Sequence, residues 1–355
     1  MLKLGIPKET KVMEGRVSLL PSAVAGIVDK GGEVFIESNA GLLSGYDNLS
    51  YGDAGAIICA SPEALYEEAE LIVKVKEPIT TDLQYLRREH QLFCYLHLAA
   101  NPCLLEQLQN IGLRAIAFET VEEGKQLPLL SPMSEIAGRV AVQSASYWLQ
   151  GHTVNGTAGR GVLLGGATAT ERGHVTVLGA GTAGTFAIME AAALGANVTV
   201  FDINPQALKR VRAIAANITA LHPSRQALTK TLTNTDLLIG AVLIPGAVAP
   251  TLITREMVHA MPKGSVIVDI SIDQGGCIET MRATDYSAPT YLDEGVIHAG
   301  VTNLPGSVPR TASAALSTAL LPYVTTLLKG RIEQCPALVR AINVDEGATV
   351  HPALM

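Results

Sequence analysis

The residues with the clearest chemical potential are glycines in the stretch "VTVLGAGTAGTFAIMEAAALGANVTVFDIN". A G-x-G-x-x-G string alone is a weak signal in a chain with 33 glycines, but this one follows a strand pattern and opens a helix pattern. There Gly179 permits the tight turn, Gly181 lets the backbone approach a pyrophosphate, and Gly184 lets the helix pack on the strand. The segment predicts a dinucleotide site.

An acidic residue follows at the end of the next predicted strand. Asp202 lies about where a carboxylate accepts hydrogen bonds from an adenosine ribose. Its negative charge would repel a 2′-phosphate, so NAD(H) is predicted over NADP(H). The alternative is a structural glycine turn with a solvated aspartate.

The stretch "ELIVKVKEP" places lysines inside an apolar run. In a strand, Lys74 and Lys76 should point the same way, and a buried pair of ammonium groups would be costly. Either that face is solvated, as on an edge strand, or something negative meets it. We expect Lys76, nearer the carboxyl end, to face a ligand, and Lys74 to be held by a carboxylate or solvated at its tip.

Other polar residues also stand where predicted strands end, and parallel sheets of this kind bind ligands outside the carboxyl ends of their strands. In the first half they are Lys8, Glu9, Lys76, His97 and Glu119. In the second half they are Asp202, the turn in "GAVLIPG", Asp273 and Asn303. Two such edges facing each other would bind a dinucleotide on one wall and a small substrate on the other.

The elements that position these residues form two series. From residue 2 to about 119, and again from 174 to about 301, short β-branched runs alternate with helical patterns. This predicts an α/β fold with two Rossmann-like, doubly wound parallel-sheet domains separated by a cleft. A long helix is expected at "SPMSEIAGRVAVQSASYWLQG", and another after Pro305, which returns to the first domain.

Bulk composition agrees with a globular protein of two domains. The 355 residues include 48% hydrophobic and 17% charged ones. A net charge of −7 without a basic run gives no support to nucleic-acid binding. No targeting segment or long apolar run is evident, so a cytoplasmic protein without membrane contact is expected. The 5 cysteines are widely spaced and lack a C-x-x-C pair, so no metal is predicted.

Several stretches together resemble the L-alanine dehydrogenase family. In order they are "GIPKET", "EGRVSLLP", "VKVKEP", "YLHLAA", "LLSPMSEIAGR", "GRGVLLGG", "LGAGTAG", "LLIGAVLIPG", "VDISIDQGGC" and "NLPGSVPRTAS". The resemblance spans nearly the whole chain. It implies NAD-dependent oxidative deamination of L-alanine to pyruvate and ammonia, and the reverse amination. It also implies a discontinuous substrate domain at 1–130 plus 306–355, an NAD domain at 131–305, and a homohexamer.

The resemblance also implies the site residues. Arg16 would bind the substrate carboxylate, Lys76 would support it or polarise the keto oxygen, and His97 would transfer protons. Asp273 would orient or deprotonate the attacking water, whereas Asp269 is expected to be structural. The cofactor would be bound by Met133, Ser134, Gly179, Gly181, Thr182, Ala183, Gly184, Asp202, Ala241, Val242, Leu243 and Asn303.

The chain departs from the family pattern at a few places. It has "GATAT" at residues 166–170 where relatives usually carry "GVPGV", and Gly15 where an aromatic residue is frequent. We expect Gly15 to make the loop around Arg16 looser, whereas "GATAT" leaves open the conformation of its own loop and any role of that loop in domain closure. The tail after Gly330 is short, which leaves open whether the outer helices form.

Two other functions remain open. The NAD(H)-binding part of a proton-translocating transhydrogenase shares this fold and much of this pattern, but it works against membrane partners. A non-catalytic NAD(H)-binding regulator is the alternative of a different class. Only an assay separates the regulator from an enzyme.

Overall fold

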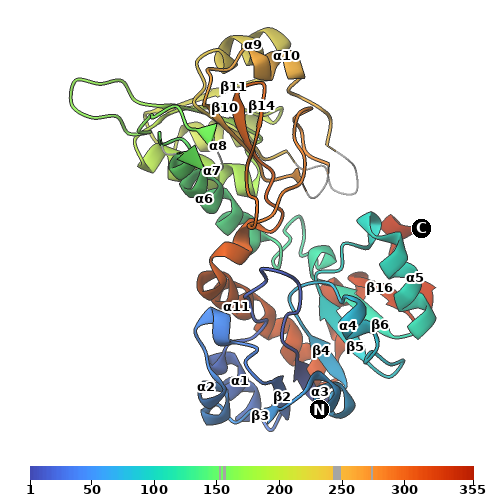
Figure 1. The fold of residues 1–355 in the computed structure, drawn as a ribbon. Coiled ribbons are helices and arrows are strands. Elements are labelled where there is room, and N and C mark those ends of the chain that lie inside the picture. The colour runs from blue at the N-terminus through green and yellow to red at the C-terminus, as the bar shows by residue number, and fades with distance from the viewer. Residues whose placement is uncertain (152, 155–156, 243–248, 273–274) are drawn as a thin grey trace. The chain divides into compact units, whose positions relative to one another are not determined.

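The computed structural model describes the chain except residues 152, 155–156, 243–248 and 273–274. It divides into two compact units (Figure 1). Unit 1 comprises Met1–Met133 and Gly306–Met355, and unit 2 comprises Ser134–Pro305. Each unit has its own sheet and hydrophobic core, so each is described by itself.

Unit 1 is built on a sheet with the strand order β17-β16-β6-β5-β4-β1-β2-β3. The first six strands along the chain are parallel, and β16 and β17 add antiparallel pairs at one edge. The strands are β1 Leu4–Ile6, β2 Val34–Glu37, β3 Ile57–Cys59, β4 Leu71–Val73, β5 Gln91–Cys94, β6 Arg114–Ala117, β16 Ile342–Asp345 and β17 Ala348–Thr349. In Figure 1 the red C-terminal strand β16 lies beside the cyan β6.

Helices cover this sheet. They are α1 Pro21–Val28, α2 Asn48–Asp53, α3 Pro62–Glu68, α4 Thr80–Leu83, α5 Pro102–Ile111, α11 Pro309–Leu328 and α12 Pro336–Arg340. Short 3-10 turns are η1 Leu42–Ser44, η2 Leu98–Ala100, η3 Phe118–Thr120, η6 Ile332–Gln334 and η7 Pro352–Leu354. Several helices begin with a proline at the first turn, where its missing N–H costs nothing.

Helix α11 returns the chain to unit 1, as predicted. The hydroxyls of Ser313 and Ser317 accept hydrogen bonds from the backbone N–H groups of Val17 and Leu20, both at 2.9 Å. Among the helices in the described part of the chain, α11 alone has the length and apolar composition to cross a membrane, and half of its most apolar window is buried. These contacts are those of a core helix.

Unit 2 has the strand order β11-β10-β9-β12-β13-β15-β14, with only β14 antiparallel. Its strands are β9 His174–Leu178, β10 Asn197–Phe201, β11 Ile218–Leu221, β12 Leu237–Gly240, β13 Val266–Asp269, β14 Tyr291–Asp293 and β15 Val296–Ala299. Its helices are α7 Thr182–Ala193, α8 Pro205–Arg212, α9 Arg225–Leu232 and α10 Arg255–His259.

The remaining elements join or extend the units. Helix α6 spans Ser131–Trp148, which confirms the long helix predicted there. A separate two-stranded sheet pairs β7 Thr153–Val154 with β8 Thr157–Ala158, and the 3-10 turn η5 spans Leu304–Ser307. The predicted α/β class with two parallel-dominated sheets is confirmed.

Both units share the order 3-2-1-4-5-6 for their parallel strands, numbered along each unit. In this order the chain reverses direction across the sheet between the first and fourth strands. The switch points lie between β1 and β4 in unit 1 and between β9 and β12 in unit 2. Ligands of doubly wound sheets bind there, so these two places are where the candidate site is built.

Candidate functional site

The glycine turn of unit 2 sits at its switch point. Gly179 has a φ of +94°, and an added Cβ would lie 2.4 Å from the Ala241 carbonyl oxygen. A Cβ on Gly184 would lie 2.0 Å from the Gly179 carbonyl oxygen. By contrast, a Cβ on Gly181 would meet nothing within 4 Å. Two glycines are thus required by the protein itself, while the third keeps open the space where α7 begins.

Asp202 lies just past β10 and binds the same turn. Its carboxylate accepts the N–H of Ala180 at 2.6 Å and the N–H of Asn204 at 2.7 Å. The carbonyl of Ala180 accepts a hydrogen bond from Arg210 at 2.8 Å. The turn therefore has a fixed shape, and Asp202 places negative charge beside it.

The other predicted cofactor residues are spread over both units. Thr182 and Ala183 form the first turn of α7, Ala241 follows β12, and Val242 packs partly on the unit 2 core. Met133 and Ser134 lie in α6 on either side of the division between the units. Asn303 has a left-handed backbone with a φ of 71°. Leu243 lies outside the described residues.

Arg16 is buried in unit 1, with 3% of its surface exposed. The Glu14 carboxylate accepts hydrogen bonds from its Nε at 2.7 Å and its Nη2 at 2.6 Å, in the bidentate geometry typical of Arg and a carboxylate. Its Nη1 lies 3.2 Å from the Met133 sulfur. Glu14 thus fixes the plane of the guanidinium. Sequence reasoning missed Glu14, although its spacing two residues from Arg16 was a usable signal.

The lysine segment differs from the predicted strand. Strand β4 ends at Val73, so Lys74 and Lys76 lie beyond it and the alternation argument does not apply. Lys74 is 1% exposed, and its Nζ lies 2.9 Å from Asp82 and 3.6 Å from Glu9. Burial alone would lower the pKa of Lys74, but the charges of Glu9 and Asp82 raise it above its usual value. The expected carboxylate partner of Lys74 is confirmed, and there are two.

Lys76 is partly exposed, and its backbone N–H donates to Glu9 at 3.3 Å. The Val75 N–H donates to the other oxygen of Glu9 at 2.5 Å. Burial raises the pKa of Glu9, while the neighbouring Lys74 charge opposes that shift. Asp82, which sequence reasoning also missed, lies in α4 and accepts the Ile79 N–H at 2.9 Å.

His97 stands after β5, outside the strand in which it was predicted. Its backbone is left-handed, with a φ of 50°, and its side chain is 43% exposed. Glu119 accepts its backbone N–H at 2.6 Å, and the ring is stacked on Tyr95 with 5.9 Å between centroids. Burial raises the pKa of Tyr95, and the Arg16 charge opposes the shift. Tyr95 therefore stacks on the His97 ring and also lies near enough to Arg16 for the Arg16 charge to affect its pKa.

Asp273 lies outside the described residues, so its predicted role stays a prediction. Asp269 is fully buried at the end of β13. Its carboxylate accepts the N–H groups of Ser271 at 2.9 Å and Cys277 at 2.8 Å, and burial raises its pKa. These contacts agree with the structural role expected for Asp269.

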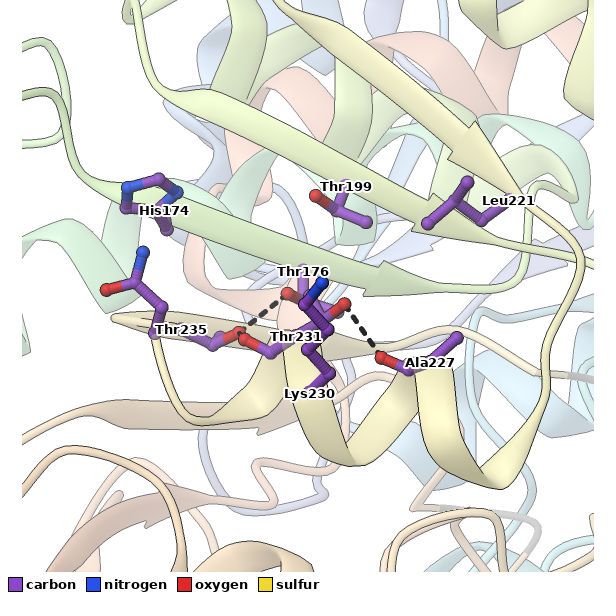
Figure 2. A pocket seen from close by; sticks show the side chains of 9 residues that line it. His174, Thr176, Thr199, Leu221, Ala227, Lys230, Thr231 and Thr235 are labelled. Atoms are coloured by element: carbon purple, nitrogen blue, oxygen red, sulfur yellow. Dashed lines mark hydrogen bonds between the residues drawn. The ribbon is translucent and has the colours of Figure 1, made fainter.

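A cavity of about 500 Å³ lies elsewhere in unit 2, between α9 and the strands β9, β10 and β11 (Figure 2). On β9 it begins at His174, the opposite end of the strand from the glycine turn. Its threonine hydroxyls bond within the protein: Thr176 to Thr235 at 2.8 Å, and Thr231 to the Ala227 carbonyl at 2.9 Å. Within the described residues no cluster of His, Cys, Asp or Glu fits a metal ion.

Family models match both parts of the chain. "Alanine dehydrogenase/PNT, N-terminal domain" matches residues 5–137, and "Alanine dehydrogenase/PNT, C-terminal domain" matches residues 141–352. The chain belongs to the alanine dehydrogenase/PNT family. It is 43% identical to an alanine dehydrogenase from Bacillus subtilis (strain 168), over 99% of this chain and 93% of the relative.

Solved structures of the family agree. An L-alanine dehydrogenase matches with a TM-score of 0.94 and 43% identity, covering 99% of this chain and 98% of the other. A transhydrogenase from Sinorhizobium meliloti matches with a TM-score of 0.84 and 27% identity, covering 99% of both chains. The predicted family resemblance is confirmed.

The structure describes the three places where the chain departs from the family pattern. Gly15 is packed, since an added Cβ would lie 3.1 Å from the Leu43 Cβ and 3.2 Å from the Pro309 Cβ. Its carbonyl also accepts the Ser44 hydroxyl at 2.8 Å, so the expected looseness finds no support here. In the "GATAT" loop, Ala169 has a left-handed φ of 67°. The tail after Gly330 still forms α12 and completes the sheet edge with β16 and β17.

Proposed function

We propose that this chain catalyses the NAD-dependent oxidative deamination of L-alanine to pyruvate and ammonia, and the reverse reductive amination. The observation that carries the proposal is that the chain is 43% identical to an alanine dehydrogenase over 99% of its length. Its Arg16, Lys76 and His97 lie beyond the strand ends of unit 1. The family is named for two activities, and the higher identity favours the dehydrogenase.

The residues of unit 2 fit a dinucleotide. The open space at Gly181, at the N-terminus of the helix α7, suits a pyrophosphate, because free N–H groups and the helix dipole favour negative charge there. The negative charge of Asp202 favours ribose hydroxyls over a 2′-phosphate, so we propose NAD(H) as the cofactor. The remaining members of the binding set are those of the family resemblance, including Leu243.

Each substrate residue has chemistry that suits its proposed role. The guanidinium of Arg16 keeps its charge and, with its plane fixed by Glu14, binds the alanine or pyruvate carboxylate. Lys76 holds the keto oxygen, and His97 passes a proton to or from the carbinolamine hydroxyl. Asp273 orients the attacking water. When bound, the nicotinamide accepts the hydride from the alanine α-carbon and returns it in the reverse reaction.

We further propose a substrate domain at 1–130 plus 306–355 and a cofactor domain at 131–305. A homohexamer in the cytoplasm is proposed on the family resemblance alone. Analytical ultracentrifugation tests the assembly, because a monomer or dimer at enzyme-assay concentration would contradict a hexamer.

The deciding assay is reductive amination of pyruvate by NADH with ammonium, followed by the loss of nicotinamide absorbance. We expect turnover that needs all three reactants and is much slower with NADPH. Hydride exchange between NADH and an oxidised NADP analogue without pyruvate would instead indicate the transhydrogenase activity. Binding of NADH without either reaction would indicate a regulator.

A further inference from the structure

In unit 1 a glutamate side chain occupies the position after the first strand at which unit 2 leaves space for a bound anion. Counted from the strand end, Glu9 follows Ile6 of β1 at the same interval at which Gly181 follows Leu178 of β9. Gly181 has nothing within 4 Å of an added Cβ, whereas Glu9 fills the corresponding position and is 7% exposed.

The Glu9 carboxylate is bound much as a ligand anion would be. It accepts successive backbone N–H groups, from Val75 at 2.5 Å and from Lys76 at 3.3 Å. These residues belong to the segment that follows the fourth strand, across the switch point from β1. The two hydrogen bonds tie the Glu9 carboxylate to the backbone at Val75 and Lys76, so Glu9 holds the Lys76 backbone in place.

A second carboxylate holds the other end of the same segment. Asp82 accepts the Ile79 N–H at 2.9 Å, and the Lys74 ammonium lies 2.9 Å from Asp82 and 3.6 Å from Glu9. Both carboxylates are buried, and without the Lys74 charge between them they would repel each other. Lys74 therefore bridges the two carboxylates that hold the backbone on either side of Lys76.

We propose that Glu9, Lys74 and Asp82 are positioning residues for substrate binding, which set the place of Lys76 through its backbone. The inference rests on the proposed function of Lys76. None of the three needs to touch the substrate, and their effect should pass through Lys76 alone.

A double-mutant cycle tests this route. Glu9→Gln keeps the size of the side chain but removes its charge, and we expect the KM for pyruvate to rise about tenfold while the NADH dissociation constant stays unchanged. In the Lys76→Ala background, Glu9→Gln should change the KM for pyruvate less than twofold, because the group it positions is gone. Glu68→Gln is the matched control, since Glu68 is exposed and pairs with Lys3 at 3.0 Å.

The outcomes separate the inference from the function. If Lys76→Ala leaves the KM for pyruvate unchanged, the proposed role of Lys76 fails and the inference fails with it. If Lys76→Ala acts but Glu9→Gln behaves like the parent enzyme, or acts equally in both backgrounds, only the positioning inference is overturned. Should Glu9→Gln fail to fold, Asp82→Asn carries the same cycle with the same expected coupling.

Discussion

The two units share one strand arrangement but differ in the residues at their switch points. Both place their parallel strands in the same order, and in both an acid at or just past the end of the second strand accepts an N–H from the turn after the first. In unit 2 Asp202 accepts the Ala180 N–H at 2.6 Å, and in unit 1 Glu37 accepts the Lys8 N–H at 2.9 Å. The framework is shared, so it cannot by itself assign the ligand.

The difference lies in the turns at the switch points. Unit 2 has glycines there and leaves backbone open beside α7, whereas unit 1 has Glu9 and the buried Lys74 at the corresponding places. Open backbone suits a pyrophosphate. In unit 1 Glu9 and Lys74 instead hold the segment that carries Lys76, the proposed contact of a small carboxylate substrate. Function therefore follows from a few turn residues, and the comparison can be tested at them.

The largest effect is expected at the buried Arg16–Glu14 pair of unit 1. Arg16→Met should lower the free energy of unfolding by about 3–5 kcal/mol, because Glu14 loses its guanidinium partner while still buried. Urea unfolding measures this change. Adding Glu14→Gln should recover part of the stability but not the activity, whereas recovery of both would show that Arg16 has no role in binding substrate.

The glycine turn of unit 2 should separate packing from binding. Gly184→Ala should cost about 1–3 kcal/mol of stability, because its Cβ would lie 2.0 Å from the Gly179 carbonyl oxygen. Gly181→Ala should keep the melting temperature of the parent and yet raise the KM for NAD about tenfold or more. If the Gly181→Ala enzyme has the same KM for NAD as the parent, the pyrophosphate does not bind at this turn.

Asp202 tests the choice of cofactor. Asp202→Ala should raise the KM for NAD about tenfold, since roughly 1.4 kcal/mol corresponds to a factor of ten, while the relative use of NADP rises. Steady-state kinetics with both cofactors at saturating alanine measures the change. An unaltered preference between NAD and NADP would mean that Asp202 is not at the ribose.

The smallest effect is expected in the "GATAT" loop. Ala169 has a φ of 67°, a conformation that disfavours any residue with a Cβ, so Ala169→Gly should stabilise the protein by about 0.5 kcal/mol. Ala167→Gly, in the same exposed loop, should instead destabilise by a similar amount. Thermal unfolding compares them, and equal shifts in one direction would contradict the strain at Ala169.

Local patterns in the sequence predicted much of this arrangement. Strand and helix periodicity gave both sheets and the helices α6 and α11, and the glycine spacing located the turn of unit 2. The charge network of unit 1 could not be predicted in the same way. Lys74 forms ion pairs with Glu9 and Asp82, and only the folded chain shows that these carboxylates lie beside it. The strand alternation argument failed because β4 ends at Val73, before either lysine.

The central claim is that substrate and cofactor are recognised by different units, and Lys76→Ala tests it most directly. The measurement is the KM for pyruvate at saturating NADH and ammonium, together with the dissociation constant of NADH from fluorescence titration. We expect the KM to rise by about tenfold or more, since a lost charge-assisted contact costs roughly 1.5–3 kcal/mol, while NADH binding stays within twofold of the parent. A parental KM, or a loss of NADH affinity equal to the loss for pyruvate, would contradict the account.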